Sequence, residues 1–265
     1  MSESMSESKS LLELSGVGIR FGGLVAVSEL DFSISCGELV GLIGPNGAGK
    51  TTVFNIITGV YTPSQGEVCF ADRSIKGLAP NQITAFGIAR TFQNIRLFSS
   101  LSVLDNVRTA LNLHLKTGMF GALWRGRKFR EEEQRVRLEA LELLEIFGLS
   151  GMADAPCRSL SYGDQRRLEI VRALATKPRL LLLDEPAAGM NPTEKVELMK
   201  LIRFTQERFG LAVLLVEHDM KVVMGICQRI AVLEYGRKIA EGTPSEIQKN
   251  QRVIAAYLGE EVMDA

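Results

Sequence analysis

The sequence predicts an α/β protein with a mainly parallel sheet, and three observations lead to that prediction. In the last third of the chain, short apolar runs alternate with helical periods, which is typical of parallel strands joined by helices. The run ELVGLIG at residues 38–44 is almost wholly apolar, as expected of a strand buried on both faces. Residues 97–163 differ from both parts, because helical periods dominate there and predict an inserted α-helical subdomain.

Strand patterns dominate residues 11–70 and predict an antiparallel β subdomain beside the parallel core. Three runs separated by Gly, Ser and Asp have this character: LLELSGVGIRF at 11–21, VAVSELDFSI at 25–34 and GEVCF at 66–70. The run at 38–44 lies between the second and the third. A helix is expected to follow that run, from near Gly49 to Gly59.

Later elements follow from periodicity and from helix start and stop signals. Apolar residues recur at helical spacing in 102–115 and 129–147, and residues 148–150 close the second stretch. The elements expected next are helix Asp164–Thr176, strand Arg179–Leu183, helix Lys195–Phe209, strand Leu211–Val216 and a hairpin at Glu234–Arg237. Thr243-Pro-Ser-Glu246 is a capping box with Pro at the first helical position, so a last helix should begin there.

Composition limits the kind of protein this can be. The 265 residues include 31 basic and 31 acidic side chains, so bulk charge gives no support to a nucleic-acid-binding function. Four cysteines lie far apart without a CxxC pair, which disfavours a zinc site or a disulfide framework. The longest apolar stretches, such as 211–216, are much shorter than the roughly 18 residues that a membrane-spanning helix needs. We expect one cytosolic domain over 11–255, with tails at 1–10 and 256–265.

Residues Gly44–Thr51, GPNGAGKT, match the phosphate-loop pattern G-x-x-x-x-G-K-[ST] between a predicted strand and a predicted helix. Glycines let successive backbone N–H groups face a phosphate, and the helix N-terminus adds the positive end of its dipole. Lys50 is expected to reach the β- and γ-phosphates of a nucleotide, and the Thr51 hydroxyl can bind Mg²⁺. The alternative is a glycine-rich turn that only caps a structural helix.

A second pattern is a buried strand that ends in two acids, Leu180-Leu-Leu-Leu-Asp184-Glu185. An aspartate at the end of such a strand, beside a phosphate loop, is the arrangement in which the carboxylate holds Mg²⁺. Glu185 could accept a proton from water that attacks the γ-phosphate. The alternative is that both acids cap the next helix. The nucleotide interpretation is favoured because parallel strands present their carboxyl ends at one sheet edge.

Four further segments accompany these motifs, and all six together resemble the ATP-binding cassette ATPases. Residues 160–165, LSYGDQ, are similar to the LSGGQ signature, with tyrosine in place of the first glycine. Gln93 in RTFQN resembles the Q-loop, His218 after LLVE resembles the switch histidine, and Phe21 resembles the aromatic residue that stacks on adenine. The motifs span residues 21–218 in the family's order. The resemblance implies that family's P-loop NTPase (RecA-like) fold.

The resemblance also implies a role for each matching residue. The catalytic residues would be Glu185, His218 and Gln93. The residues binding ATP would be Phe21, Asn46, Gly47, Gly49, Lys50, Thr51 and Thr52. The ligands of Mg²⁺ would be Thr51, Gln93 and Asp184. The residues facing the ATP of a second cassette would be Ser161, Gly163 and Gln165, so that hydrolysis requires two cassettes closed head-to-tail.

Some of these residues have plainer explanations when each is taken alone. Ser161 could simply cap a helix, and Gln93 could be an ordinary exposed polar residue. His218 could be structural, and Phe21 could belong to the core. Asn191 stands where many cassettes have aspartate, so its role is not carried over.

Longer phrases narrow the resemblance to the ATPases of bacterial branched-chain amino acid importers, among them EHDMKVVM at 217–224 and VIAAYLGE at 253–260. This implies uptake of leucine, isoleucine and valine, at the cytoplasmic face of the inner membrane. The implied partners are a second ATPase subunit, two permeases and, indirectly, a periplasmic binding protein. Importers of urea or amides, lipopolysaccharide exporters and soluble cassettes are the alternatives, because no residue here would touch the transported molecule.

Residues 116–137 carry seven basic side chains and the only tryptophan, Trp124. A solvated helix face is one interpretation of this segment. Contact with the anionic cytoplasmic leaflet or with permease loops is the other.

Overall fold

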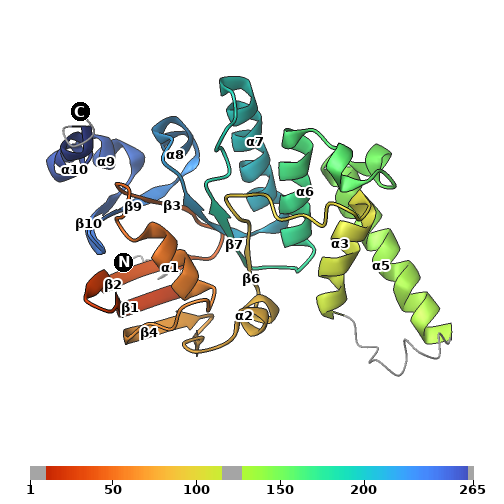
Figure 1. Cartoon of the computed structure of the whole chain (residues 1–265), viewed down its shortest axis with the longest axis horizontal. Coiled ribbons are helices and arrows are strands. Elements are labelled where there is room, and N and C mark those ends of the chain that lie inside the picture. The colour runs from red at the N-terminus through yellow and green to blue at the C-terminus, as the bar shows by residue number, and fades with distance from the viewer. Residues whose placement is uncertain (1–9, 115–126, 262–265) are drawn as a thin grey trace, which may run out of the picture. The chain divides into compact units, whose positions relative to one another are not determined.

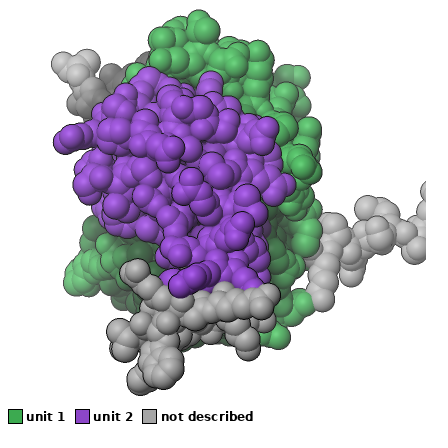
Figure 2. Space-filling model, turned by 90° about the vertical axis from the view of Figure 1, so that its right-hand side faces the viewer, with its two compact units in different colours: residues 1–88, 179–265 green, residues 89–178 purple. Residues whose placement is uncertain are grey.

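The computed structural model describes residues 10–114 and 127–261, and these form two compact units. The first unit extends to Ile88 and resumes at Arg179, and the second comprises Ala89–Pro178. Figure 1 traces the chain through its elements, and Figure 2 distinguishes the two units by colour. The second unit is therefore inserted, in sequence, into the first.

A six-stranded sheet has the strand order β10-β9-β3-β8-β7-β6. Its strands are β3 (Leu39–Ile43), β6 (Ile88–Arg90), β7 (Leu180–Asp184), β8 (Ala212–Val216), β9 (Arg229–Glu234) and β10 (Arg237–Gly242). β9, β3, β8 and β7 pair in parallel, and β10 pairs antiparallel with β9 at one edge. Every residue of β3, β7 and β8 is buried, which accounts for their continuous apolar sequences.

A second, antiparallel sheet has the order β2-β1-β4-β5. Its strands are β1 (Ser10–Phe21), β2 (Leu24–Ser35), β4 (Gln65–Phe70) and β5 (Arg73–Ser74). The register between β1 and β4 shifts between Ser15 and Gly18, so β1 is irregular at that point. Phe21 lies at the end of this long strand.

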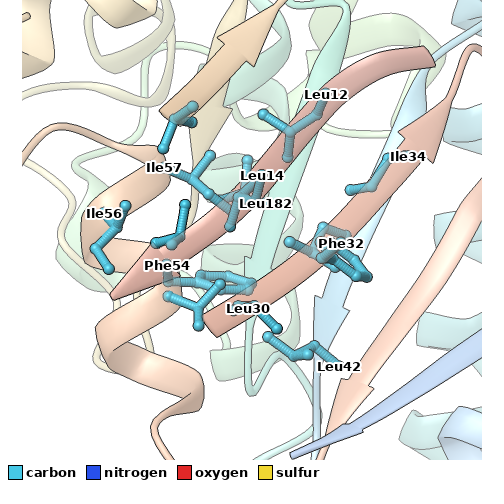
Figure 3. Packing of buried hydrophobic residues seen from close by; sticks show 14 of the residues in the cluster. Leu12, Leu14, Leu30, Phe32, Ile34, Leu42, Phe54, Ile56, Ile57 and Leu182 are labelled. Carbon is cyan, nitrogen blue, oxygen red and sulfur yellow. The ribbon is translucent and has the colours of Figure 1, made fainter. Parts of the chain in front are cut away.

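Helix α1 (Lys50–Ile57) joins the two sheets through a shared core. Its buried residues Phe54 and Ile57 belong to the same apolar cluster as Leu14 of β1, Leu30 of β2 and Leu182 of β7 (Figure 3). The opposite face of the parallel sheet carries α7 (Pro192–Phe209) and α8 (Met220–Ile226) (Figure 1). The first unit also contains α2 (Pro80–Phe86), α9 (Pro244–Lys249) and α10 (Gln251–Glu261).

The second unit consists mainly of helices. They are α3 (Val103–Leu111), α5 (Arg127–Ile146) and α6 (Tyr162–Leu174), with the short 3-10 turns η1 (Asn112–His114), η2 (Ser150–Met152) and η3 (Cys157–Ser159). Their buried residues include Val107, Leu144 and Leu168, each fully shielded from solvent. The apolar side chains that recur at helical spacing in the sequence therefore form the core of this unit.

The predicted fold class is confirmed, and several boundaries are corrected. The helix predicted over Asp164–Thr176 is α6, which begins two residues earlier, and the helix predicted over Lys195–Phe209 is α7, which begins three residues earlier. The physical reason is capping, because Ser161 and Asn191 occupy the N-cap positions. The predicted hairpin is β9–β10.

The prediction of a last helix at Thr243 is half right. Helix α9 begins there, and the Glu246 carboxylate accepts the N–H of Thr243 at 2.7 Å, as a capping box requires. A further helix, α10, follows it. The sequence reasoning also missed α2, β5, β6 and α8, all of which are seven residues long or shorter.

Within residues 10–114 and 127–261, every helix is too short or too polar to span a membrane. Residues 116–126 of the predicted basic segment 116–137 lie outside the described residues. Its described part falls in α5, where Arg135 forms an exposed ion pair with Glu132.

Two glycines with nearly the same φ provide a test of the close packing of β1 and β4. Gly66 has φ 76° and Gly77 has φ 77°. A methyl group on Gly66 would lie 2.4 Å from the carbonyl oxygens of Ser15 and Gly16, whereas one on Gly77 would meet nothing within 4 Å. We expect Gly77→Ala to lower the free energy of unfolding by about 1 kcal/mol, and Gly66→Ala to lower it by about twice that or more. Urea denaturation measures both, and equal losses would contradict the packing described.

Candidate functional site

The phosphate loop adopts a backbone that glycine accepts more readily than other residues. Gly44, Gly47 and Gly49 have φ of 150°, 77° and 101°. A methyl group on Gly44 would lie 2.1 Å from the carbonyl oxygen of Leu233, and one on Gly49 would lie 2.7 Å from that of Ala26. At Gly47 a methyl group would meet nothing within 4 Å. Two of the glycines are therefore required by neighbouring backbone, and the third borders open space.

Lys50 is buried at the first residue of α1, and its ammonium group turns back over the loop. Nζ donates hydrogen bonds to the carbonyl oxygens of Gly44 (2.5 Å) and Pro45 (2.8 Å). The N–H groups of the first helical turn lie at this same end of α1, so positive charge and donors are gathered there. The other predicted nucleotide-binding residues of this region are Asn46 and Thr51, which are exposed, and Thr52, which is half-buried.

β7 brings Asp184 and Glu185 to the sheet edge at which the phosphate loop begins. In the parallel register, Leu42 of β3 is level with Val216 of β8, and Val216 is level with Asp184. Neighbouring strands lie about 4.8 Å apart, so β3 and β7 are separated by roughly 10 Å across β8. The loop starts two residues after Leu42. The structure thus places both predicted motifs at one edge of one sheet.

Glu185 and His218, two predicted catalytic residues, lie close together. Glu185 has a left-handed backbone with φ 44°, a conformation that costs on the order of 1–2 kcal/mol for a residue with a side chain. Its N–H donates to the carbonyl oxygen of Val216 (2.9 Å), the last residue of β8. His218 follows β8, and its Nδ1 lies 3.7 Å from Glu185 Oε2. The His218 side chain is 65% exposed, so the imidazole remains accessible from solvent.

Glu217 is a buried acid at the centre of this region that the sequence reasoning did not identify. Its Oε1 accepts the N–H of Ala187 at 2.7 Å, and its Oε2 accepts the N–H of His218 at 3.1 Å. A longer contact, 3.4 Å, joins Oε2 to the N–H of Asp219. Burial raises the pKa of the Glu217 carboxyl, and the N–H of Ala187 opposes that shift. One carboxylate therefore joins the segment after Glu185 to the segment that carries His218.

Asp219, the residue after His218, fixes the start of α8. Its carboxylate accepts the N–H of Lys221 (2.9 Å) and pairs with the Lys195 ammonium of α7 at 2.6 Å. The hydrogen bond from Lys195 lowers the pKa of Asp219. The segment that carries His218 is thus held at both of its flanks.

Phe21, the predicted adenine-stacking residue, is 43% exposed at the end of β1. Its ring meets Tyr61 edge-to-face, with 5.0 Å between ring centroids and 67° between the ring planes. Tyr61 follows α1 and packs against the apolar core. The sequence reasoning missed Tyr61, because only the fold brings residue 61 beside residue 21.

The remaining predicted site residues lie in the second unit. Ser161 caps α6: its Oγ accepts the N–H of Asp164 at 3.2 Å. A methyl group on Gly163 would meet only Ser161 Oγ, at 4.0 Å, so the surrounding chain leaves room there. The Gln165 side chain donates to the carbonyl oxygen of Leu160 (3.0 Å). Gln93 is exposed, and its carbonyl oxygen accepts a hydrogen bond from Arg166 (3.1 Å).

Asn191, for which no role was carried over, has a clear local function in the first unit. Its side chain accepts the N–H of Glu194 at 3.0 Å, and the Glu194 carboxylate accepts the N–H of Asn191 at 2.8 Å. This reciprocal pair is a capping box at the start of α7.

The side-chain oxygens at this edge of the sheet are suitable ligands for a Mg²⁺ ion that is bound together with phosphate. Asp184 supplies a buried carboxylate at the end of β7, and Thr51 supplies a hydroxyl in the first turn of α1. Across the part of the chain that the structure describes, no three His, Cys, Asp or Glu side chains form a group that could hold a metal ion. Mg²⁺ usually takes one or two carboxylates from the protein and its other ligands from water and substrate phosphates. The residues present fit that pattern.

Comparison with known proteins places this site in a family. The family described as ABC transporter matches residues 27–188, and the family described as branched-chain amino acid ATP-binding cassette transporter matches residues 237–262. The chain is 47% identical over 253 residues to LivG, the high-affinity branched-chain amino acid transport ATP-binding protein of Escherichia coli strain K12. That alignment covers 96% of this chain and 99% of LivG.

Two solved structures share the fold over most of their length. The ADP conformation of MJ1267, an ATP-binding cassette of an ABC transporter, has a TM-score of 0.82 and 28% identity, covering 95% of this chain and 99% of that chain. The dimeric post-hydrolysis state of the ATP-binding cassette MJ0796, bound to ADP and Pi, has a TM-score of 0.72 and 29% identity, covering 88% and 98%.

The chain therefore belongs to the ATP-binding cassette family of ABC transporters and is an ATP-hydrolysing enzyme of that family. Within the family it is similar to LivG over 96% of its length, and the match of residues 237–262 to the branched-chain amino acid family agrees with that similarity.

Replacement of Glu217 by glutamine tests whether this acid positions the site. The amide can accept through one oxygen only, so one or more of the three backbone N–H groups loses its partner. An unsatisfied buried donor costs about 1–3 kcal/mol. We expect the Kd of Glu217→Gln for ATP to stay within about threefold of the wild-type value. Its kcat should fall about tenfold, because misplacement of the segments that carry Glu185 and His218 would raise the transition-state free energy by about 1.4 kcal/mol.

Glu246→Gln is the matched control, because Glu246 also accepts a backbone N–H but lies at the start of α9. Steady-state ATPase assays and calorimetric ATP titration on the folded variants measure both effects. Equal turnover in the two variants would show that Glu217 has no positioning role.

Proposed function

We propose that the chain is the ATP-hydrolysing subunit of an importer of branched-chain amino acids. The structural observation that carries the proposal is the row Leu42–Val216–Asp184, which sets the phosphate loop and the acids of β7 at one edge of the sheet. The amino acid substrate is supported by the LivG-type similarity and by the C-terminal family match. No described residue is assigned to binding the transported molecule.

Each site residue would have a separate role in ATP binding or hydrolysis. Lys50 and the N–H groups of the phosphate loop would bind the β- and γ-phosphates of ATP, and Phe21 would stack on adenine. Glu185 would take a proton from the water that attacks the γ-phosphorus, as the bond from that phosphorus to the ADP oxygen breaks. His218, 3.7 Å from Glu185, would hold the departing phosphoryl group in line.

The metal-binding residues would be Thr51, Asp184 and Gln93. When bound there, Mg²⁺ would neutralise the charge of the β- and γ-phosphate oxygens. The rest of the catalytic effect would come from positioning and from excluding alternative orientations of the attacking water.

The partners would be a second cassette, two permease subunits and, through them, a periplasmic binding protein. The room in front of Gly163, beside the capped N-terminus of α6, supports a contact with phosphate bound by another cassette. MJ0796 is a cassette with a dimeric structure, which supports pairing here too. The complex would place this chain at the cytoplasmic face of the bacterial inner membrane. Ser161, Gly163 and Gln165 would be the residues that face the partner's ATP.

Lys50→Ala tests the binding site directly. The substitution removes an ammonium group that donates to two loop carbonyls, and a charge-assisted contact with phosphate is worth about 1.5–3 kcal/mol. We expect the Kd for a fluorescent ATP analogue to rise at least tenfold. Lys76→Ala is the control, because Lys76 also donates to a backbone carbonyl, that of Gly66, but is exposed in the antiparallel sheet region. Equal Kd values for both variants would contradict this placement of the nucleotide.

Glu185→Gln tests the chemistry and the transport function together. The amide keeps the size of the side chain but cannot accept the water proton, so we expect unchanged ATP binding and a loss of at least a hundredfold in kcat. In a bacterial strain lacking the native gene, wild-type chain should restore uptake of labelled leucine and the variant should not. Restored uptake by the variant would refute the role of Glu185. Restored uptake of urea or amides, but not of leucine, would refute the substrate.

A further inference from the structure

Arg166 is a charged residue buried in the second unit, with only 1% of its surface exposed. Its guanidinium group donates to two successive carbonyl oxygens of the chain, those of Phe92 (2.9 Å) and Gln93 (3.1 Å). It also donates to the Tyr162 hydroxyl (3.1 Å). Phe92 and Gln93 lie about 70 residues before Arg166 in the sequence, whereas Tyr162 lies one helical turn before it. Only the fold brings all three acceptors together.

Glu169 completes the arrangement from the same helix, three residues further along. Its Oε2 pairs with Arg166 at 2.8 Å, and both side chains are 1% exposed. Its Oε1 accepts the N–H of Phe92 at 3.2 Å. The peptide groups at residues 92–93 are therefore held by a donor and an acceptor at once, and we call Arg166 and Glu169 together the α6 clamp.

Tyr162 links the α6 clamp to the first turn of α6. It stands where the signature motif has its first glycine, a departure that the proposed hydrolysis mechanism does not use. Its ring also lies beside the guanidinium group, with 5.8 Å from the Arg166 carbon to the ring centroid. The tyrosine adds a hydroxyl acceptor and an aromatic surface that glycine cannot supply.

The chemistry of the α6 clamp indicates positioning rather than stability. A buried ion pair is often no more stabilising than well-packed apolar residues of similar volume, because both charges lose their hydration. The hydrogen bonds named above go to Gln93, which is a predicted site residue, and to Phe92 and Tyr162, which are next to predicted site residues. Arginine suits this task because its planar fork can satisfy several acceptors in fixed directions.

We propose that Arg166, Glu169 and Tyr162 are positioning residues that make the backbone at Gln93 and the N-terminus of α6 move as one rigid piece. This proposal rests on the proposed function, in which Gln93 faces the chain's own nucleotide and Ser161 faces the nucleotide of a second cassette. The α6 clamp would then couple the two contacts mechanically.

The test uses the full chain and the double variant Arg166→Met with Glu169→Leu, which replaces the buried charges by apolar side chains. Arg167→Met is the matched control, because Arg167 is the next residue of α6 and its side chain is 43% exposed. Hydrogen–deuterium exchange of the Phe92 and Gln93 amides, without nucleotide, reports the first consequence. We expect at least tenfold faster exchange in the double variant and a change of less than twofold in the control.

Steady-state kinetics report the second consequence. The double variant should lose at least tenfold in kcat, with an ATP Kd within threefold of wild type. Tyr162→Phe, which removes only the hydroxyl, should lose kcat to a smaller extent. If the double variant does not fold, Arg166→Lys serves instead, because lysine keeps the ion pair but cannot satisfy both carbonyls and the hydroxyl in the same geometry.

Wild-type exchange at residues 92–93 in a folded variant, or accelerated exchange with wild-type kcat, would overturn the proposal. Failure of the proposed function looks different, because the wild-type chain would then neither bind nor turn over ATP. The exchange measurement needs no nucleotide, so it judges the α6 clamp in either case.

Discussion

The parallel register of β3, β8 and β7 is the constraint on which the candidate site depends. It sets Leu42, Val216 and Asp184 in one row, so the loop after β3, the acids after β7 and the histidine after β8 emerge at the same edge. Side chains alternate along a strand, so a slip of one residue would turn Asp184 to the other face of the sheet. All three strands are buried on both faces, and such burial strongly disfavours a slip.

The phosphate loop depends on this sheet and also on its neighbours. The carbonyl oxygen of Ala26, in the antiparallel sheet, lies 2.7 Å from where a side chain on Gly49 would begin and 2.6 Å from where one on Gly236 would begin. Strand β2, the loop and the β9–β10 turn thus meet with no space for a methyl group. The N–H of Ser28 donates to the carbonyl oxygen of Gly236 (2.9 Å) and holds that meeting point. Packing against β2 and the β9–β10 turn therefore constrains the outer side of the loop.

Outside the helices and strands, buried charged side chains form hydrogen bonds with backbone groups that have no partner in a regular element. The segments at Ala187 and at residues 92–93 lie outside helices and strands, yet their backbone N–H and C=O groups need partners when shielded from water. Glu217 satisfies the first segment, and Arg166 with Glu169 satisfies the second. Because each of these acids and bases reaches two segments, the hydrogen bonds that stabilise the loops also relate their positions to one another.

Sequence alone determined the elements whose signals are local: the apolar strands, the glycine-rich turn, the paired acids and the capped helices. Each depends on residues within about one turn or one strand of one another, so the pattern is visible without the fold. Tyr61, Glu217 and Arg166 could not be found in that way. Each acts on a partner that is remote in sequence or on backbone atoms, and backbone atoms carry no sequence signal. Only tertiary packing decided those contacts, because burial is what converts an ordinary tyrosine, glutamate or arginine into a group with fixed partners.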